Sequence, residues 1–127
     1  MKNSTLYDIF QIAAPEISWA RIEWNTLKTN DDGSFSIDVL LCEDVDDNRV
    51  SGQVFKITND SIRRGCSLWI DEYRFRRLAK RAMGNFSEAR LQAFTRFLDT
   101  DGDEGDIDGW AADAVFQYGL FGEVIFS

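Results

Sequence analysis

Three aspartates at alternate positions, Asp99, Asp101 and Asp103, form the pattern in this sequence that points most directly to chemistry. Calcium is a hard cation that takes six to eight oxygen ligands, and loops that bind it carry acidic residues at alternate positions. We therefore consider these three carboxylates as ligands of a weak calcium site. We expect no other metal or cofactor for this chain.

This run resembles the calcium-binding loop of EF-hand proteins, because a helix is expected on each side of it. Two positions depart from the EF-hand pattern. The sixth position should be glycine but is Glu104, with Gly105 one residue late, and the twelfth is Trp110 instead of a bidentate glutamate. The alternative is a solvated loop in which Asp106 or Asp108 caps the N-terminus of the next helix.

Catalytic chemistry has little basis in this composition. The chain contains no histidine, which removes the commonest general base and most zinc, copper and haem sites. Its motifs include no nucleophile elbow, phosphate-binding loop or dinucleotide-binding fingerprint. Cys42 and Cys66 lack metal-ligand spacing, and we interpret them as buried, reduced thiols. The sequence favours a protein that is not an enzyme and has no catalytic residues.

A cluster of five basic residues lies between positions 74 and 81, with apolar residues interleaved. Such a helix is typical of phosphate-contacting segments in nucleic-acid-binding proteins. The net charge of −8 opposes attraction to nucleic acid at long range, so the alternative is pairing with acidic residues of the same chain. The members of this basic patch are Arg74, Arg76, Arg77, Lys80 and Arg81.

Acidic residues are concentrated in two tracts on either side of this basic region. Residues 30–48 carry seven acids and no base, and residues 98–127 carry eight acids and no base. These tracts either keep the protein soluble or imitate a phosphate backbone and occupy the basic groove of a partner protein. The residues predicted to bind such a partner are Asp31, Asp32, Asp44, Asp46, Asp47, Asp106 and Asp108.

The length of 127 residues and the hydrophobic content of 44% predict a single domain, residues 1–127, with a substantial core. A helical period over 4–14 ends at Pro15, and a period of two follows it. In the middle strand, the residues predicted to face the core are Phe35, Ile37, Val39 and Leu41. Short turns join the expected strands, which predicts a three-stranded antiparallel meander formed by 19–27, 35–42 and 50–58.

The helical period returns at residue 59 with two opposite apolar stripes. The first contains Ile62, Cys66, Trp69, Ile70 and Tyr73, and the second contains Phe75, Leu78, Ala79, Ala82 and Met83. One straight helix cannot bury both stripes against one sheet, so we expect a break within 71–74 and two helices. A strand over 67–75 is the alternative, because alternate residues there are also apolar.

Two further helices are expected around the acidic loop. The one before it buries Phe86, Ala93, Phe94, Phe97 and Leu98, and the one after it buries Trp110, Ala111, Ala114 and Tyr118. Residues 123–126 are either a tail docked in a groove or a short edge strand. The predicted fold class is therefore α+β, with a three-stranded antiparallel meander and about four to five helices, mostly C-terminal.

Membrane association is not indicated by the sequence. No run approaches the roughly 18 consecutive apolar residues of a membrane-spanning helix. The first residues also lack the apolar region of a signal peptide, so we expect a cytoplasmic protein.

The segment 108–126 resembles the C-terminal ending of small phage and prophage accessory proteins. In that pattern an aspartate, a glutamine and Phe-Gly-Glu precede a hydrophobic end, as Asp113, Gln117 and residues 121–123 do here. The Ile-Arg-Arg-Gly run at 62–65 is similar as well. The resemblance covers less than a third of the chain and implies a bacterial cytoplasm. Small acidic proteins of that setting are often inhibitors of host defence, of the anti-CRISPR or anti-restriction type.

Three functional hypotheses remain open at this point. The first is a non-enzymatic accessory protein whose acidic surface binds a host protein that has a basic surface. The second is a weak calcium-binding or nucleic-acid-contacting module, built on the loop after Asp99 or on the basic patch. The third is a structural or assembly component of a phage.

Overall fold

The computed structural model describes the backbone of residues 1–44, 49–78 and 88–125, and the side chains of 1–42, 52–74 and 89–125. These residues form a three-stranded antiparallel sheet and four α-helices, so the predicted α+β class, with mostly C-terminal helices, is confirmed. The elements in chain order are α1 (Asn3–Ala13), the 3-10 turn η1 (Ala14–Glu16), β1 (Ala20–Thr29), β2 (Phe35–Asp44), β3 (Arg49–Thr58), α2 (Asn59–Leu78), α3 (Glu88–Asp99) and α4 (Gly109–Phe121).

The sheet is a meander in the order β1-β2-β3, as predicted. The turn between β1 and β2 is closed by Asp32, whose carboxylate accepts hydrogen bonds from the N–H and the hydroxyl of Ser34 at 2.9 and 2.6 Å. Gly33 supplies the positive φ of 84° that this turn needs. The ladder between β1 and β2 is regular except for a bulge between Glu23 and Lys28.

The core-facing side of β2 is the one that the alternating pattern predicts. Phe35, Ile37 and Val39 are buried. Beyond Leu40 the register with β3 shifts, so Leu41 is only partly buried while Cys42 is buried. The extra residues of this shift lie on β3, because Leu40 pairs with Val54 and Cys42 with Val50. The predicted alternation of fully buried residues in β2 ends at Val39.

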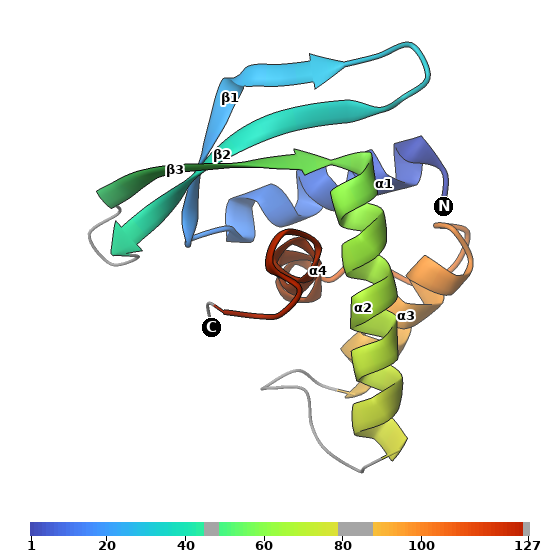
Figure 1. Cartoon of the computed structure of the whole chain (residues 1–127). Coiled ribbons are helices and arrows are strands. Elements are labelled where there is room, and N and C mark those ends of the chain that lie inside the picture. The colour runs from blue at the N-terminus through green and yellow to red at the C-terminus, as the bar shows by residue number, and fades with distance from the viewer. Residues whose placement is uncertain (45–48, 79–87, 126–127) are drawn as a thin grey trace.

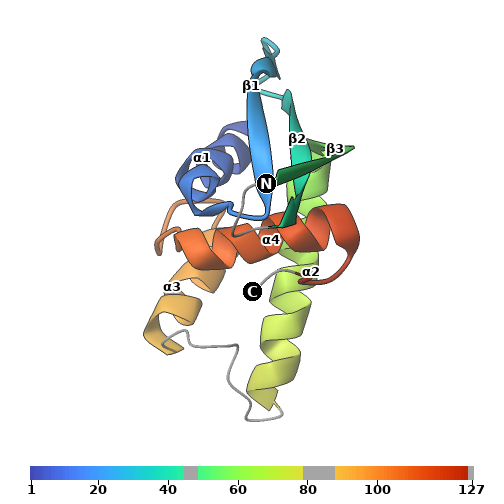
Figure 2. The ribbon, with the colours of Figure 1, turned by 90° about the vertical axis from the view of Figure 1, so that its left-hand side faces the viewer.

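The helices lie on one side of the sheet. Figure 1 shows α1 and α4 beneath the strands. The helix α2 begins at the end of β3 and runs away from the sheet. In Figure 2 the lower half of α2 lies opposite α3, with α4 crossing above. The largest fully buried side chains of this core are Trp19, Trp69, Phe10, Phe94, Phe116 and Leu6. No described helix combines the length with the apolar character that crossing a bilayer requires.

The helix α2 is continuous from Asn59 to Leu78, so the predicted break within 71–74 and the alternative strand over 67–75 are both wrong. The first predicted stripe is buried except for Ile70, which is partly buried. Within it, Trp69 meets Phe94 of α3 edge-on at 5.0 Å. The prediction assumed that the sheet is the partner of α2, whereas α2 packs mainly on α4. Different faces of one helix can therefore have different partners. The second stripe lies outside the described side chains.

The last two helices only partly follow their predicted stripes. In α3, Phe94, Phe97 and Leu98 are buried as expected, and Phe86 lies outside the described residues. In α4, Ala111 is buried, but Trp110 is 60% exposed, so its predicted burial is wrong. The interior positions of α4 that the prediction missed are Ala112, Val115, Phe116, Gln117 and Gly119.

The described part of the C-terminal tail is not a strand, and a hydrogen bond ties it to α4. The backbone N–H of Ile125 donates a hydrogen bond of 2.9 Å to the side-chain oxygen of Gln117 in α4. The helix itself ends at Gly122, which takes the left-handed φ of 77° that favours glycine at this position. Val124 and Ile125 are 45% and 54% exposed, so neither predicted alternative for this segment, a tail docked in a groove or an edge strand, is observed in its described part.

Candidate functional site

Two acidic segments that are distant in sequence meet at the N-terminus of α1. On one side, the Asn3 side-chain amide donates to the backbone oxygen of Asp32 at 3.0 Å. On the other, the Lys2 N–H donates to a carboxylate oxygen of Asp101 at 2.9 Å, and the Thr5 hydroxyl donates to the Asp101 carbonyl at 3.2 Å. Figure 1 shows the turn 30–34 and the loop 100–107 beside the N-terminus. The first turn of α1 thus joins them at one end of the molecule.

The start of α2 is a third segment that adds a negative charge to this end. Asn59 accepts a hydrogen bond of 2.6 Å from the Phe35 N–H and donates one of 3.1 Å to the side-chain oxygen of Asn3. Asp60 follows directly, and its side chain is 95% exposed. We call this surface the acidic pole and define it by Asp31, Asp32, Asp60, Asp101 and Asp103.

The charge of the acidic pole is only partly compensated by nearby cations. Arg63 pairs with Asp60 at 2.9 Å, and the Lys2 side chain and the N-terminal ammonium act on Asp101. Hydrogen bonds from Ser34 lower the pKa of Asp32 below its ordinary value, so its carboxylate stays ionised in mildly acidic solution. The five carboxylates of the acidic pole therefore outnumber the cations near them, and the pole carries net negative charge.

The other residues predicted to bind a partner lie elsewhere. Asp44 ends β2, at the end of the sheet opposite the turn 30–34 (Figure 1), while its side chain and both Asp46 and Asp47 lie outside the described residues. Asp106 is exposed in the loop before α4. The acidic residues of the predicted set are thus divided between both ends of the sheet.

Asp108 is a helix cap with little exposed surface. One of its carboxylate oxygens accepts a hydrogen bond of 3.0 Å from the Ala111 N–H, and the other lies 2.5 Å from the Arg90 guanidinium. Only 8% of its side chain is exposed. This arrangement confirms the predicted cap at Asp108 and leaves Asp108 outside the acidic pole.

The loop predicted to bind calcium is held by contacts within the protein. Asp99 lies 3.6 Å from Arg74, and Glu104 lies 2.7 Å from Arg96. Among the described side chains, no group of three Asp, Glu, Cys or His residues is placed to hold a metal ion. The contacts of Asp99, Asp101 and Glu104 account for the shape of the loop without a cation. The calcium site itself stays a prediction.

Of the basic patch, the structure describes the side chain of Arg74 alone. It is more than half exposed and faces Asp99 at the end of α3. This contact is of the kind expected for internal pairing of the patch. Arg76, Arg77, Lys80 and Arg81 lie outside the described side chains.

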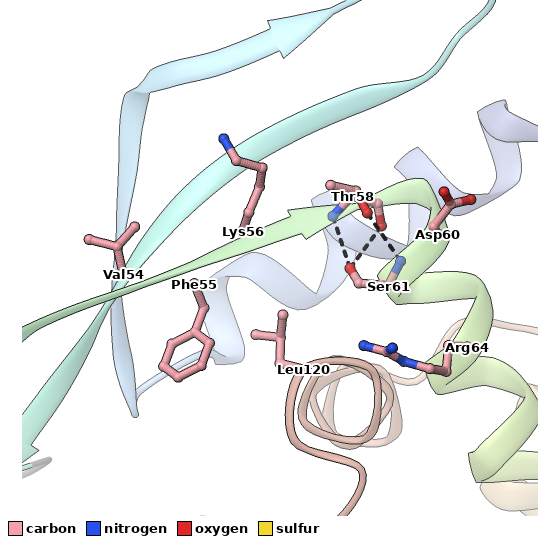
Figure 3. A pocket seen from close by; sticks show the side chains of 8 residues that line it. All are labelled: Val54, Phe55, Lys56, Thr58, Asp60, Ser61, Arg64 and Leu120. Atoms are coloured by element: carbon pink, nitrogen blue, oxygen red, sulfur yellow. Dashed lines mark hydrogen bonds between the residues drawn. The ribbon is translucent and has the colours of Figure 1, made fainter.

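Figure 3 shows a hollow of about 430 Å³ between β3, the first turns of α2 and the end of α4. It is lined by Val54, Phe55, Lys56, Thr58, Asp60, Ser61, Arg64 and Leu120. The Arg64 guanidinium donates to the backbone oxygen of Gly119, and the Ser61 hydroxyl donates to the backbone oxygen of Thr58 at 2.9 Å. These polar groups hold β3, α2 and α4 together, which explains their presence here without a ligand.

The residues that carry the phage-protein resemblance form a structural network. The Asp113 carboxylate accepts hydrogen bonds from the Trp19 indole N–H at 2.7 Å and from the Gln117 amide at 3.3 Å. Burial raises the pKa of Asp113 to about 6, against these two hydrogen bonds, which lower it. Sequence analysis did not find this network, because nothing in the pattern links residue 19 to the last helix. Its geometry fixes the tail instead of forming an exposed site.

No family model matches the sequence, and neither curated proteins nor solved structures give a significant match.

Proposed function

We propose that this protein is a non-enzymatic binding protein whose acidic pole engages a basic surface of a partner protein. The observation that carries the proposal is the meeting of the turn 30–34 and the loop 100–107 on the first turn of α1. Backbone and side-chain hydrogen bonds hold both segments, so the carboxylates are presented in a fixed arrangement. A pre-organised charged surface loses little conformational entropy when a partner binds.

The electrostatics of the whole chain favour the same kind of partner. A net charge of −8 attracts cationic surfaces and repels nucleic acid at long range. A charged surface of this kind acts mainly on the rate of association, which falls as salt screens the field over about 10 Å.

The C-terminal resemblance supplies the proposed setting, a phage or prophage accessory protein in a bacterial cytoplasm. Proteins that handle nucleic acids present basic grooves because they neutralise phosphates. An acidic surface that occupies such a groove blocks it. The partner we propose is therefore a nucleic-acid-handling component of a host defence system, of the CRISPR or restriction type.

The test is affinity capture from bacterial lysate at low and raised salt, with two charge-matched variants. Asp31→Asn with Asp103→Asn removes two charges from the acidic pole. Asp71→Asn with Glu123→Gln removes two exposed charges outside it. We expect the wild type and the second variant to capture the same basic protein at low salt, and the first variant to lose most of it.

Equal capture by both variants would overturn the acidic pole as the binding surface. Capture that does not weaken as salt is raised would overturn the electrostatic mode of binding. Direct retention of nucleic acid after nuclease-free washing would contradict the choice of a protein partner.

A further inference from the structure

A second hollow, also of about 430 Å³, lies between α1 and β1 and is mainly apolar. It is lined by Tyr7, Gln11, Ala14, Pro15, Ile22 and Trp24. Trp24 is 55% exposed even though its ring lies 5.6 Å from that of Phe10 in the core. It follows Glu23, where β1 leaves the regular ladder with β2. A bulge at this point aims a large aromatic side chain at the rim of a hollow.

Exposed tryptophan at the edge of an apolar hollow is typical of a protein-binding surface. Tryptophan is among the residues that contribute most when an interface buries them. The Trp24 ring already contacts the Phe10 ring, with centroids 5.6 Å apart and the planes inclined at 55°, so less conformational freedom is lost on binding than for an uncontacted side chain. The unburied part of the ring is apolar area that a partner side chain can cover.

The hollow opens beside the acidic pole. Tyr7, at one end of it, meets the ring of Phe35 edge-on at 4.9 Å. Phe35 is the first residue after the turn that carries Asp31 and Asp32. Asp8 is exposed three positions before Gln11, so these two residues are neighbours on the surface of α1. Carboxylates therefore lie next to apolar lining.

We propose that this hollow receives an apolar side chain from a basic amphipathic segment of the partner protein, whose Lys or Arg residues contact the acidic pole. This inference rests on the proposed function and names the kind of segment that the partner contributes. Charge complementarity selects this occupant over a second copy of the chain, because a second copy would bring the same acidic surface and a further charge of −8.

The experiment uses two short synthetic peptides with identical lysines, one carrying leucines between them and the other serines. Each is titrated into the full chain, and binding is followed by the amide and indole signals in NMR spectra. We expect the leucine peptide to bind at least about tenfold more tightly and to shift the signals of Trp24 and Tyr7. The serine peptide should shift signals of the acidic pole alone.

Trp24→Ala should lower the affinity for the leucine peptide about tenfold, whereas Trp110→Ala, which removes the other large exposed indole, should not change it. Gln11→Arg is a second variant that places a positive charge on the exposed rim without touching the core. Gln11→Arg should weaken binding of the leucine peptide more than binding of the serine peptide. A melt of each variant confirms that it is folded.

The outcomes separate this inference from the proposed function. Equal affinity of the two peptides, with no effect of Trp24→Ala, overturns the docking site. If Asp31→Asn with Asp103→Asn still weakens both peptides in that case, the acidic pole stands. Binding of neither peptide overturns both proposals. Self-association in sedimentation that Trp24→Ala abolishes overturns the choice of occupant in favour of a second copy.

Discussion

Gly119 of α4 lies directly against the backbone carbonyl of Ser61 in α2, with no room for a Cβ between them. One helical turn away, Gly65 lies just as close to the carbonyl of Val115. The two helices therefore cross in backbone contact, and Arg64 adds a hydrogen bond to the Gly119 carbonyl. This crossing fixes α4 beneath the sheet. It also fixes the start of the tail, which follows α4 and is hydrogen-bonded to it.

Gly119→Ala should lower the free energy of unfolding by more than about 2 kcal/mol, because the new Cβ meets backbone that cannot move away. Gly65→Ala should act in the same direction. Gly109→Ala in the same helix is the control, since its Cβ meets only the flexible Glu16 side chain. We expect that variant to stay within about 0.5 kcal/mol of the wild type. Urea unfolding followed by circular dichroism measures all three, and equal effects would contradict the close crossing.

Asp113 should make the stability depend on pH between about 4 and 6. Burial raises its pKa from the ordinary 3.8 to about 6 in the folded protein. The folded carboxyl binds its proton more tightly than the unfolded one, so the free energy of unfolding decreases as pH rises through this window. The loss is on the order of 2–3 kcal/mol and is complete above the folded pKa.

Asp113→Asn isolates this effect, because asparagine does not titrate and the other carboxylates cancel in the comparison. The stability of the wild type relative to the variant should be higher at about pH 4 than at about pH 7. Urea unfolding at both pH values gives this difference. If the stability difference between wild type and variant is independent of pH, or increases with pH, burial does not raise the pKa of Asp113.

Local sequence patterns predicted the buried face of β2 and the cap of α4. The alternation of Phe35, Ile37 and Val39 identifies the buried face of β2, because a half-buried strand has a period of two. Asp106 or Asp108 was predicted as the cap, since an acidic residue just before an apolar helix accepts its first N–H groups, and Asp108 is the one observed. The break in α2 was predicted wrongly because packing partners are a tertiary property.

The acidic pole could not be assembled from the sequence. Composition identified the acidic tracts, but their meeting depends on Asn3, Thr5 and Asn59. These are polar residues that sequence patterns do not distinguish from solvated ones. The exposure of Trp24 could not be predicted either, because it lies where the register of β1 with β2 shifts after Glu23, and no local pattern marks that shift. Long-range contacts and strand irregularities decide both features.

Calcium should leave the melting temperature of the protein nearly unchanged. A site of about millimolar affinity in about 1 mM calcium adds only about 0.4 kcal/mol to the free energy of unfolding. The contacts of Asp99 with Arg74 and of Asp101 with Lys2 already occupy two of the three predicted ligands. Melting is compared in calcium and in chelator, with magnesium at matched ionic strength as control. A calcium-specific increase of about ten degrees would establish a strong site and reverse this expectation.

Replacement of Asp108 should show that its carboxylate has two separate roles, as a cap and as the partner of Arg90. Asp108→Asn keeps an oxygen for the Ala111 N–H but removes the charge that faces Arg90, at a cost of about 1 kcal/mol. Asp108→Ala removes both contacts at this buried position and should cost about 2–3 kcal/mol.

Asp106→Ala is the matched control for these variants, since Asp106 is exposed in the same loop and should change the stability by less than about 0.5 kcal/mol. The three variants are compared by urea unfolding at one pH and at two salt concentrations. The pair with Arg90 is a charge interaction that both variants lose, so the stability difference between each variant and the wild type should decrease with salt. The difference between the Asn and Ala variants reports the cap, which is a hydrogen bond, and should stay nearly constant. If Asp108→Ala costs no more than Asp106→Ala, Asp108 does not anchor the N-terminus of α4.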